Sequence, residues 1–148
     1  VGSANRGREL FASLMQALKF PGYYVVHDRS QAQALSADEY RRILGSSRMV
    51  LNNGTLTANT RVVTGRVFES VWSRSLVLEE SGADTSELLV PFIHYIPFAN
   101  VHQFVSYAQF FAKHETRRLQ IVRAAYEWAT TYFLPSKFWA AVRHKLAI

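Results

Sequence analysis

The sequence has no cysteine, and it has only two methionines and four prolines among 148 residues. The absence of cysteine excludes disulfide bonds, thiol catalysis and cysteine-ligated zinc, and it favours a reducing compartment over a secretory one. Long apolar runs are also lacking, since polar residues or proline interrupt every stretch well before the roughly 20 residues of a membrane span. A chain of about 150 residues can bury enough surface to fold without disulfides or metals. We therefore expect residues 1–148 to form one cytoplasmic domain, with peripheral membrane association left open.

Positive charge exceeds negative charge, with 17 Lys and Arg against 11 Asp and Glu and a formal net charge of +6. Such a surplus suits nucleic acid, an anionic membrane surface or a phosphorylated ligand. The basic residues are spread along the whole chain in pairs such as Arg41-Arg42 and Arg117-Arg118, without the block of like charges that a basic arm shows. This distribution favours general solvation and does not favour nucleic acid as the partner.

Hydrophobic periodicity predicts helices and strands in alternation. Helices are expected over 8–19, from Ser36, from Gly65, from Asp84, from Asn100, over 115–133 and over 136–146. Strands are expected over 23–26, 48–51, 76–78 and 94–98, and residues 52–64 are expected to form a loop. Strand and helix alternation implies right-handed crossovers and a parallel sheet. The predicted fold is α/β, a parallel sheet flanked by helices with a helical C-terminal end.

Three segments have the spacing of a capping box, with the cap at Ser36, Asp84 or Asn100 and Glu or Gln three residues later. In the long helix, the apolar spacing predicts one buried stripe. Its members are Leu119, Val122, Tyr126, Ala129 and Phe133. In the last helix, Phe138, Trp139 and Val142 are expected to pack inward.

A predicted helix opens with the sequence GRVFE at residues 65–69, which places an arginine and a glutamate three residues apart on one helix face. Near a helix N-terminus, backbone N–H groups and the helix dipole favour anions, so Arg66 is a candidate phosphate ligand and Glu69 a candidate acceptor for sugar hydroxyls. The alternative is a surface ion pair between the two, which contributes about 0.2–0.5 kcal/mol. Their position after a loop and before a buried strand favours ligand binding.

Polar residues also follow the predicted strands, at the edge where open α/β sheets bind ligands. Asn52, Asn53 and Thr55 are candidate contacts to a base or a sugar, although Asn-Asn-Gly is also an ordinary turn former. His27, at another strand end, is a further candidate. For His94, which lies in an apolar segment, a hydrogen-bonded core position is favoured over a catalytic or phosphate-binding role. The remaining histidines lack metal-ligand spacing, so no metal site is expected.

Several short motifs, taken in order, resemble the C-terminal half of a GT-B glycosyltransferase. They are VGS at residues 1–3 with Arg8, the strand that ends at Asn52, GRVFES leading to LVLEE, and HYIPF at residues 94–98. The nearest patterns are those of group 1 glycosyltransferases of the spore-maturation CgeB type. A second match is the CAP10-like protein O-glucosyltransferase group, in which an Arg-Phe pair precedes a strand and a His-Tyr-hydrophobic-Pro segment follows.

The resemblance implies a Rossmann-like three-layer domain that binds a nucleotide-diphosphate sugar and requires no cofactor. Arg66 matches the position that binds the donor diphosphate, and Glu69 matches the acidic residue that holds the ribose hydroxyls. Gly2 and Ser3 match a loop whose backbone approaches the phosphates, and Arg8 matches a basic residue that opens the next helix. The function implied is glycosyl transfer to an acceptor hydroxyl of a carbohydrate, a lipid or a protein.

In such enzymes the acceptor, and often the catalytic base, belong to an N-terminal domain. That domain is expected to be missing here, because the sequence starts within a recognisable loop, and no catalytic residue is assigned. Retaining enzymes with two glutamates eight positions apart would need an acidic residue where this chain has Arg61. The segment Ser73-Arg74-Ser75 also stands where many group 1 members carry a small residue or glycine. The alternative function is a noncatalytic α/β module with a basic face for RNA or phosphorylated partners.

Overall fold

The computed structural model describes residues 6–19, 35–57, 60–82 and 84–146. The chain divides into two compact units, Val1–Arg42 and Ile43–Ile148. The predicted strand over 23–26 lies outside the described residues, and so do the predicted site residues Gly2, Ser3 and His27.

The first unit contains helix α1 (Arg6–Ala17) and the beginning of helix α2 (Ala37–Ser46). Ser36 and Glu39 form the predicted capping box: the Glu39 amide donates to Ser36 Oγ at 3.2 Å, and the Ser36 amide donates to Glu39 Oε2 at 2.9 Å. Hydrogen bonds from the Ser36 hydroxyl and amide lower the pKa of the Glu39 carboxyl. The start of α2 is thus fixed by local chemistry.

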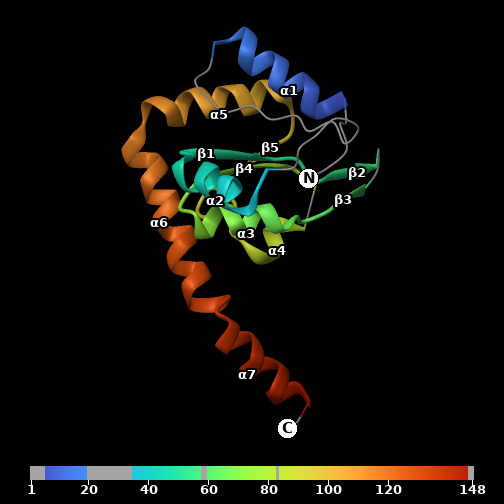
Figure 1. The fold of residues 1–148 in the computed structure, drawn as a ribbon, viewed down its shortest axis with the longest axis vertical. Helices are drawn as coiled ribbons and strands as arrows, with labels where there is room; N and C mark the ends of the chain where they lie inside the picture. Colours follow the sequence, from blue (N-terminus) through green and yellow to red (C-terminus); the bar gives the residue numbers. More distant parts are fainter. Residues whose placement is uncertain (1–5, 20–34, 58–59, 83, 147–148) are drawn as a thin grey trace. The chain divides into compact units, whose positions relative to one another are not determined.

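The second unit is built on a parallel three-stranded sheet with the order β1-β4-β5 (Figure 1). The strands are β1 (Met49–Asn52), β4 (Leu76–Glu80) and β5 (Ile96–Phe98). The register sets Asn52 beside Glu79, and Leu78 beside Ile96. The central strand β4 is buried from Leu76 to Glu79 because it has a strand on each side and helices over its faces.

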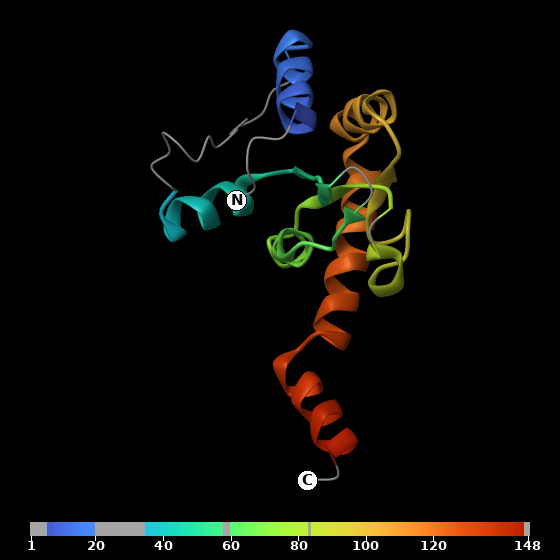
Figure 2. The same cartoon turned by 90° about the vertical axis from the view of Figure 1, so that its right-hand side faces the viewer.

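Helices cover both faces of this sheet. Those of the second unit are α3 (Gly65–Trp72), α4 (Thr85–Leu88), α5 (Val101–Lys113), α6 (Glu115–Tyr132) and α7 (Pro135–Leu146). Figures 1 and 2 show α5 on the opposite side of the sheet from α3 and α4. The predicted α/β fold, Rossmann-like with a parallel sheet between helices and a helical C-terminal end, is therefore confirmed.

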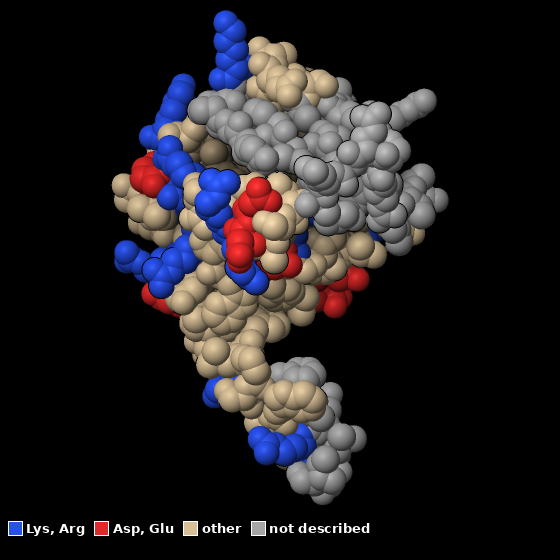
Figure 3. Space-filling view, in the orientation of Figure 1, with Lys and Arg blue, Asp and Glu red and all other residues tan. Residues whose placement is uncertain are grey.

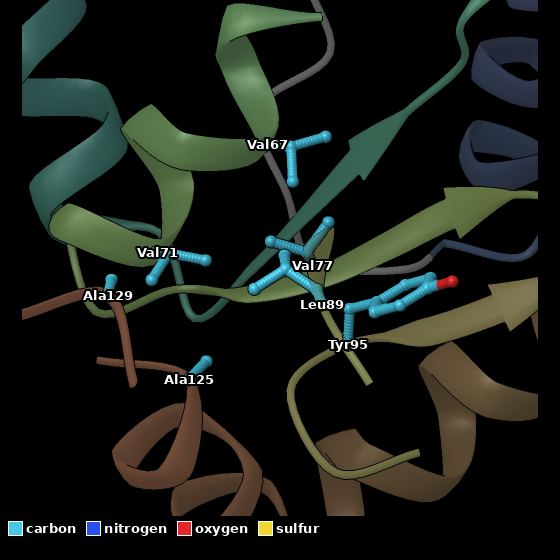
Figure 4. Packing of buried hydrophobic residues seen from close by; sticks show 7 residues of the cluster. All are labelled: Val67, Val71, Val77, Leu89, Tyr95, Ala125 and Ala129. Carbon is cyan, nitrogen blue, oxygen red and sulfur yellow. The ribbon is translucent and has the colours of Figure 1, made fainter. Parts of the chain in front are cut away.

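The core between α3, α6 and the sheet consists of small and branched side chains together with Tyr95 (Figure 4). Val67 and Val71 come from α3, Val77 from β4, and Ala125 and Ala129 from α6. Each of these five side chains is at most 3% exposed, so α3 is held firmly against the sheet. This packing positions the first turn of α3, which carries Arg66.

The predicted loop over 52–64 is only partly a loop. It contains a short antiparallel pair, β2 (Thr55–Thr57) and β3 (Thr60–Arg61). The Val62 amide donates to the Gly54 carbonyl at 3.0 Å, and a Cβ atom on Gly54 would lie 2.2 Å from the Val62 carbonyl oxygen. The backbone segments at Gly54 and Val62 approach so closely that only glycine fits at position 54. The periodicity of apolar residues does not predict this tertiary contact.

Two details of the predicted helix packing are wrong. In α6, Val122 and Ala129 are buried as predicted, but Leu119 is 45% exposed, and Arg118 and Ala125 complete the buried face. Arg118 can face inward because its guanidinium donates to the Arg48 carbonyl at 2.9 Å and to both carboxylate oxygens of Glu115. In α7, Trp139 is 57% exposed rather than packed inward, and the side chains of Phe138 and Val142 lie outside the described ones.

The predicted caps at Asp84 and Asn100 have different outcomes. Asn100 Oδ1 accepts from the Gln103 amide at 3.0 Å and caps α5 as predicted. Asp84 precedes α4 but makes no side-chain capping bond; the Glu87 amide donates to its backbone carbonyl instead. Among the helices of the described residues, none has the length and the apolar character that crossing a membrane requires.

Candidate functional site

The N-terminus of α3 is tied to the carboxyl end of β1. Thr64, the N-cap residue of α3, has extended backbone angles, and its hydroxyl donates to Asn52 Oδ1 at 2.9 Å. Asn52 is the last residue of β1. The first turn of α3 therefore lies at the carboxyl edge of a parallel sheet, which is where open α/β folds bind their ligands.

Of the predicted pair, Arg66 belongs to this first turn, and Glu69 lies at the beginning of the next turn of α3. Arg66 is the second residue of α3 and is partly buried, whereas Glu69 is exposed. A Cβ atom on Gly65 would lie 3.9 Å from Glu69 Oε1, so the Glu69 carboxylate extends back toward the start of its helix. Among the described residues, none of the ion pairs joins Arg66 to Glu69.

A buried carboxyl group lies behind this turn. Glu79, near the end of β4, is only 1% exposed; its Oε2 accepts from Asn52 Nδ2 at 2.6 Å, and its Oε1 accepts from Thr85 Oγ1 at 3.4 Å. Burial raises the pKa of Glu79 to about 7, because it disfavours the charged form more than the bonds from Asn52 and Thr85 favour it. The carboxyl group therefore changes charge near neutral pH.

Sequence reasoning missed the role of Glu79. In the sequence, Glu79 is recognisable only as one of two acidic residues that follow an apolar strand. A signal was present, because the buried strand over 76–78 continues without a turn residue into Glu79. A carboxylate in line with a fully buried strand needs partners. The identity of those partners could not be read from spacing, since Asn52 is 27 positions away.

Arg61 lies where two-glutamate enzymes would need an acidic residue, and it pairs with the end of β4. Its Nη2 atom is 3.7 Å from Glu80 Oε1, and both side chains are partly buried. The Arg61 Nε atom is buried and has no hydrogen-bond partner within the described residues. The pair joins β3 to the carboxyl end of β4, so this edge of the sheet carries both charge signs.

The other predicted site residues lie in different elements and differ in burial. Asn52 and Asn53 are buried, and both ends of the Asn52 amide are hydrogen-bonded within the protein. Thr55 lies in β2 and Arg8 lies in α1, but neither side chain is among the described ones. The structure thus brings Arg66, Glu69 and Asn52 together at one sheet edge.

His94 is a core residue, as the sequence favours. It is 7% exposed, its Nδ1 accepts from the Val90 amide at 3.1 Å, and its ring centroid is 5.4 Å from that of Trp128. Burial lowers the pKa of His94, which favours the neutral ring that this acceptor role requires. His94 is therefore satisfied within the fold.

The described residues contain no group of three His, Cys, Asp or Glu side chains that could hold a metal ion. They do contain an apolar hollow of about 330 Å³ beside α5, and none of the residues that line it is charged. Its lining is Phe92, Ile96, Ser106, Tyr107, Phe110 and Phe111. This composition suits apolar contact and not a diphosphate, so the candidate site remains the first turn of α3.

A family model described as Glycosyl transferase-like matches residues 6–141. The chain belongs to this glycosyl transferase-like family. The match runs from α1 into α7 and includes the α3 turn and the Glu79 network of this glycosyltransferase-like domain. No curated protein matches the sequence. The narrower CgeB-like and CAP10-like resemblances stay predictions.

Proposed function

We propose that this glycosyltransferase-like domain binds a nucleotide-diphosphate sugar at the first turn of α3. The glycosyl group of this donor is then transferred to an acceptor hydroxyl. The observation that carries the proposal is the placement of Arg66 and Glu69 together at a helix start that lies on the carboxyl edge of the parallel sheet. Helix starts and such sheet edges both favour phosphate groups.

Arg66 and Glu69 bind different parts of the donor. Arg66 is always charged, and its planar guanidinium matches the oxygens of a diphosphate. Charge-assisted hydrogen bonds of this kind contribute about 1.5–3 kcal/mol each. Glu69 accepts hydrogen bonds from the paired ribose hydroxyls. Arg66 and the N–H groups of α3 also stabilise the negative charge that develops on the diphosphate as the glycosyl bond breaks.

The proposal extends to parts that lie outside this turn. Gly2, Ser3 and Arg8 are proposed to contact the phosphates, and Asn53, Thr55 and His27 are proposed to contact the base or the sugar. No cofactor is proposed. An N-terminal GT-B domain is proposed to supply the acceptor site and the catalytic base, with a cytoplasmic location for the whole enzyme.

The face of the molecule in Figure 3 supports a local site better than a basic docking surface. Both charge signs occur among the described residues of this face. Within the second unit, Arg48 and Arg118 pair with Glu115, and Arg61 pairs with Glu80. A nucleic-acid surface requires a continuous basic patch or stripe. No specific observation therefore favours the RNA-binding alternative.

The test is calorimetric titration of the folded protein with UDP and with GDP. We expect saturable binding of at least one nucleotide, and we expect Arg66→Ala to weaken it roughly 10- to 150-fold, the range that a loss of about 1.5–3 kcal/mol gives. Arg74→Ala is the matched control, because Arg74 is an exposed arginine just after the other end of α3, over the Tyr126 ring. Absence of saturable binding by either nucleotide would overturn the proposal, and unchanged binding by Arg66→Ala would overturn the site assignment.

A further inference from the structure

A chain of two hydrogen bonds, one buried and one partly buried, runs from the central strand to the start of α3. Glu79 Oε2 accepts from Asn52 Nδ2, and Asn52 Oδ1 accepts from the Thr64 hydroxyl. Glu79 and Asn52 are each 1% exposed, so neither end of the Asn52 amide depends on solvent for its partner. The chain joins β4, β1 and α3 at the carboxyl edge of the sheet.

Above a pH of about 7, where Glu79 is ionised, its carboxylate fixes the direction of every bond in this chain. An ionised carboxylate only accepts, so Asn52 must present its NH₂ group to Glu79 and its carbonyl oxygen to Thr64. Thr64 must then donate its only hydroxyl proton to Asn52. Glu79, on β4, thereby determines which hydrogen bond the hydroxyl of the N-cap residue Thr64 makes.

Because the Thr64 hydroxyl donates to Asn52, the N-terminus of α3 lacks the usual side-chain cap. A threonine at an N-cap ordinarily accepts a hydrogen bond from an amide of the first turn. The Thr64 side chain makes no such bond, because it is turned toward Asn52. The Val67 amide donates to the Thr64 carbonyl at 3.1 Å, but the Gly65 and Arg66 amides precede any acceptor within the helix. Without a side-chain cap, these two amides are left for an external acceptor such as a phosphate oxygen.

We propose that Glu79 is a positioning residue for the donor, which acts through Asn52 and Thr64 to hold the first turn of α3 uncapped and aimed at the diphosphate. This inference rests on the proposed function, since it assigns how the same site is oriented. Glu79 does not touch the donor; it determines the hydrogen-bonding state of the turn that does. Arg66 follows Thr64 by two positions, so a shift of the N-cap also moves the guanidinium.

The structure offers a matched control on the same carboxyl group. Thr85 Oγ1 donates to Glu79 Oε1 from α4, and Thr85 is as buried as Asn52. Thr85→Val removes a hydroxyl from Glu79 without interrupting the chain to α3. Thr64→Val removes the hydroxyl that completes the chain, with the same change of side chain. A purely structural role for the network predicts equal effects of the two substitutions on binding.

The experiment measures UDP and GDP affinity by calorimetry for the wild type, Thr64→Val, Thr64→Ser and Thr85→Val, each shown by circular dichroism to be folded. We expect Thr64→Val to weaken the binding about tenfold, and Thr64→Ser, which keeps the hydroxyl, to stay within about twofold of the wild type. Thr85→Val is also expected to stay within about twofold. Equal effects of Thr64→Val and Thr85→Val, or unchanged binding by Thr64→Val, would overturn the positioning role while the proposed function stands.

A second pair of variants tests Glu79 itself and does not depend on the stability of the Thr64 variants. Glu79→Gln keeps an acceptor for Asn52, and we expect affinity within about threefold of the wild type; Glu79→Met removes the acceptor and is expected to weaken binding about tenfold. Equal affinities of these two variants would overturn the inference. If the wild type binds neither nucleotide, the proposed function fails first and this inference fails with it.

Discussion

Asn52 Nδ2 donates to Glu79 Oε2 across 2.6 Å, and this bond joins the carboxyl ends of β1 and β4 beneath the first turn of α3. The two residues are also partners in the sheet register. An amide and a carboxylate on adjacent strands thus occupy a position that an α/β core ordinarily fills with apolar side chains. The stability of this edge therefore depends on how that carboxylate is hydrogen-bonded.

Glu79→Gln should remove a pH dependence of stability. The folded pKa of Glu79 is raised from 4.5 to about 7, so the folded state holds this proton more tightly than the unfolded state. The contribution of Glu79 is therefore fully present below pH 4.5 and is lost as the pH rises through about 7. We expect the wild type to lose roughly 1–3 kcal/mol from this group over that window, and Glu79→Gln to lose none of it.

The measurement is urea denaturation at several pH values from 4.5 to 8. Glu87→Gln is the matched control, because Glu87 is an exposed residue on α4, and it should keep the wild-type slope. A Glu79→Gln protein whose stability varies with pH as the wild type does would contradict the assignment of this titration to Glu79.

Glu69→Ala should affect only donors that carry ribose hydroxyls. If Glu69 accepts from a ribose hydroxyl, we expect the substitution to weaken UDP binding roughly 10- to 150-fold, since a hydrogen bond to a charged group contributes about 1.5–3 kcal/mol. The affinity for 2′,3′-dideoxy-UDP should change less than about twofold. Calorimetry with the two nucleotides measures both values, and equal losses for both would place Glu69 away from the ribose.

Arg118→Ala should destabilise the second unit more than the neighbouring Arg117→Ala. Arg118 is 6% exposed and donates to the Arg48 carbonyl and to both carboxylate oxygens of Glu115, so its removal takes away three hydrogen bonds. The Arg48 carbonyl keeps its bond from the Leu76 amide. We expect a loss of about 1–3 kcal/mol. Arg117 is exposed, with a hydrogen bond to Gln120 at 3.4 Å, and its loss should cost less than about 0.5 kcal/mol. Urea denaturation compares the two, and equal free energies of unfolding would refute the inward role of Arg118.

Gly54→Ala should disrupt the β2–β3 pair. The new methyl group would lie 2.2 Å from the Val62 carbonyl oxygen, so the backbone must move, at a cost of about 1–3 kcal/mol. Gly45→Ala is the matched control, because a Cβ atom there has no neighbour within 4 Å and alanine suits α2 better than glycine by up to about 1 kcal/mol. Thermal denaturation should show opposite shifts, and a Gly54→Ala protein as stable as the wild type would show that this close approach is absent in solution.

Local sequence signals predicted most of the elements in the described residues. The capping box at Ser36 and the cap at Asn100 fixed two helix starts through contacts within three residues. The apolar run over 76–78 predicted a strand buried on both faces, and β4 has that burial. The pairing of β2 with β3 was missed, because it depends on the close approach of Gly54 to Val62 and not on apolar periodicity.

The sequence by itself determined the order of most elements, the parallel α/β architecture and the placement of Arg66 and Glu69 near the start of a helix. These features follow from the period of apolar residues and from short-range caps, which a chain displays locally. Only the tertiary structure decided that Glu79 is buried against Asn52, that Thr64 is turned away from its own helix, and that Arg118 faces inward. The reason is distance along the chain: the partners of Glu79 and Arg118 lie 27 and 70 positions away, and burial and hydrogen-bond choice are settled only when those segments meet.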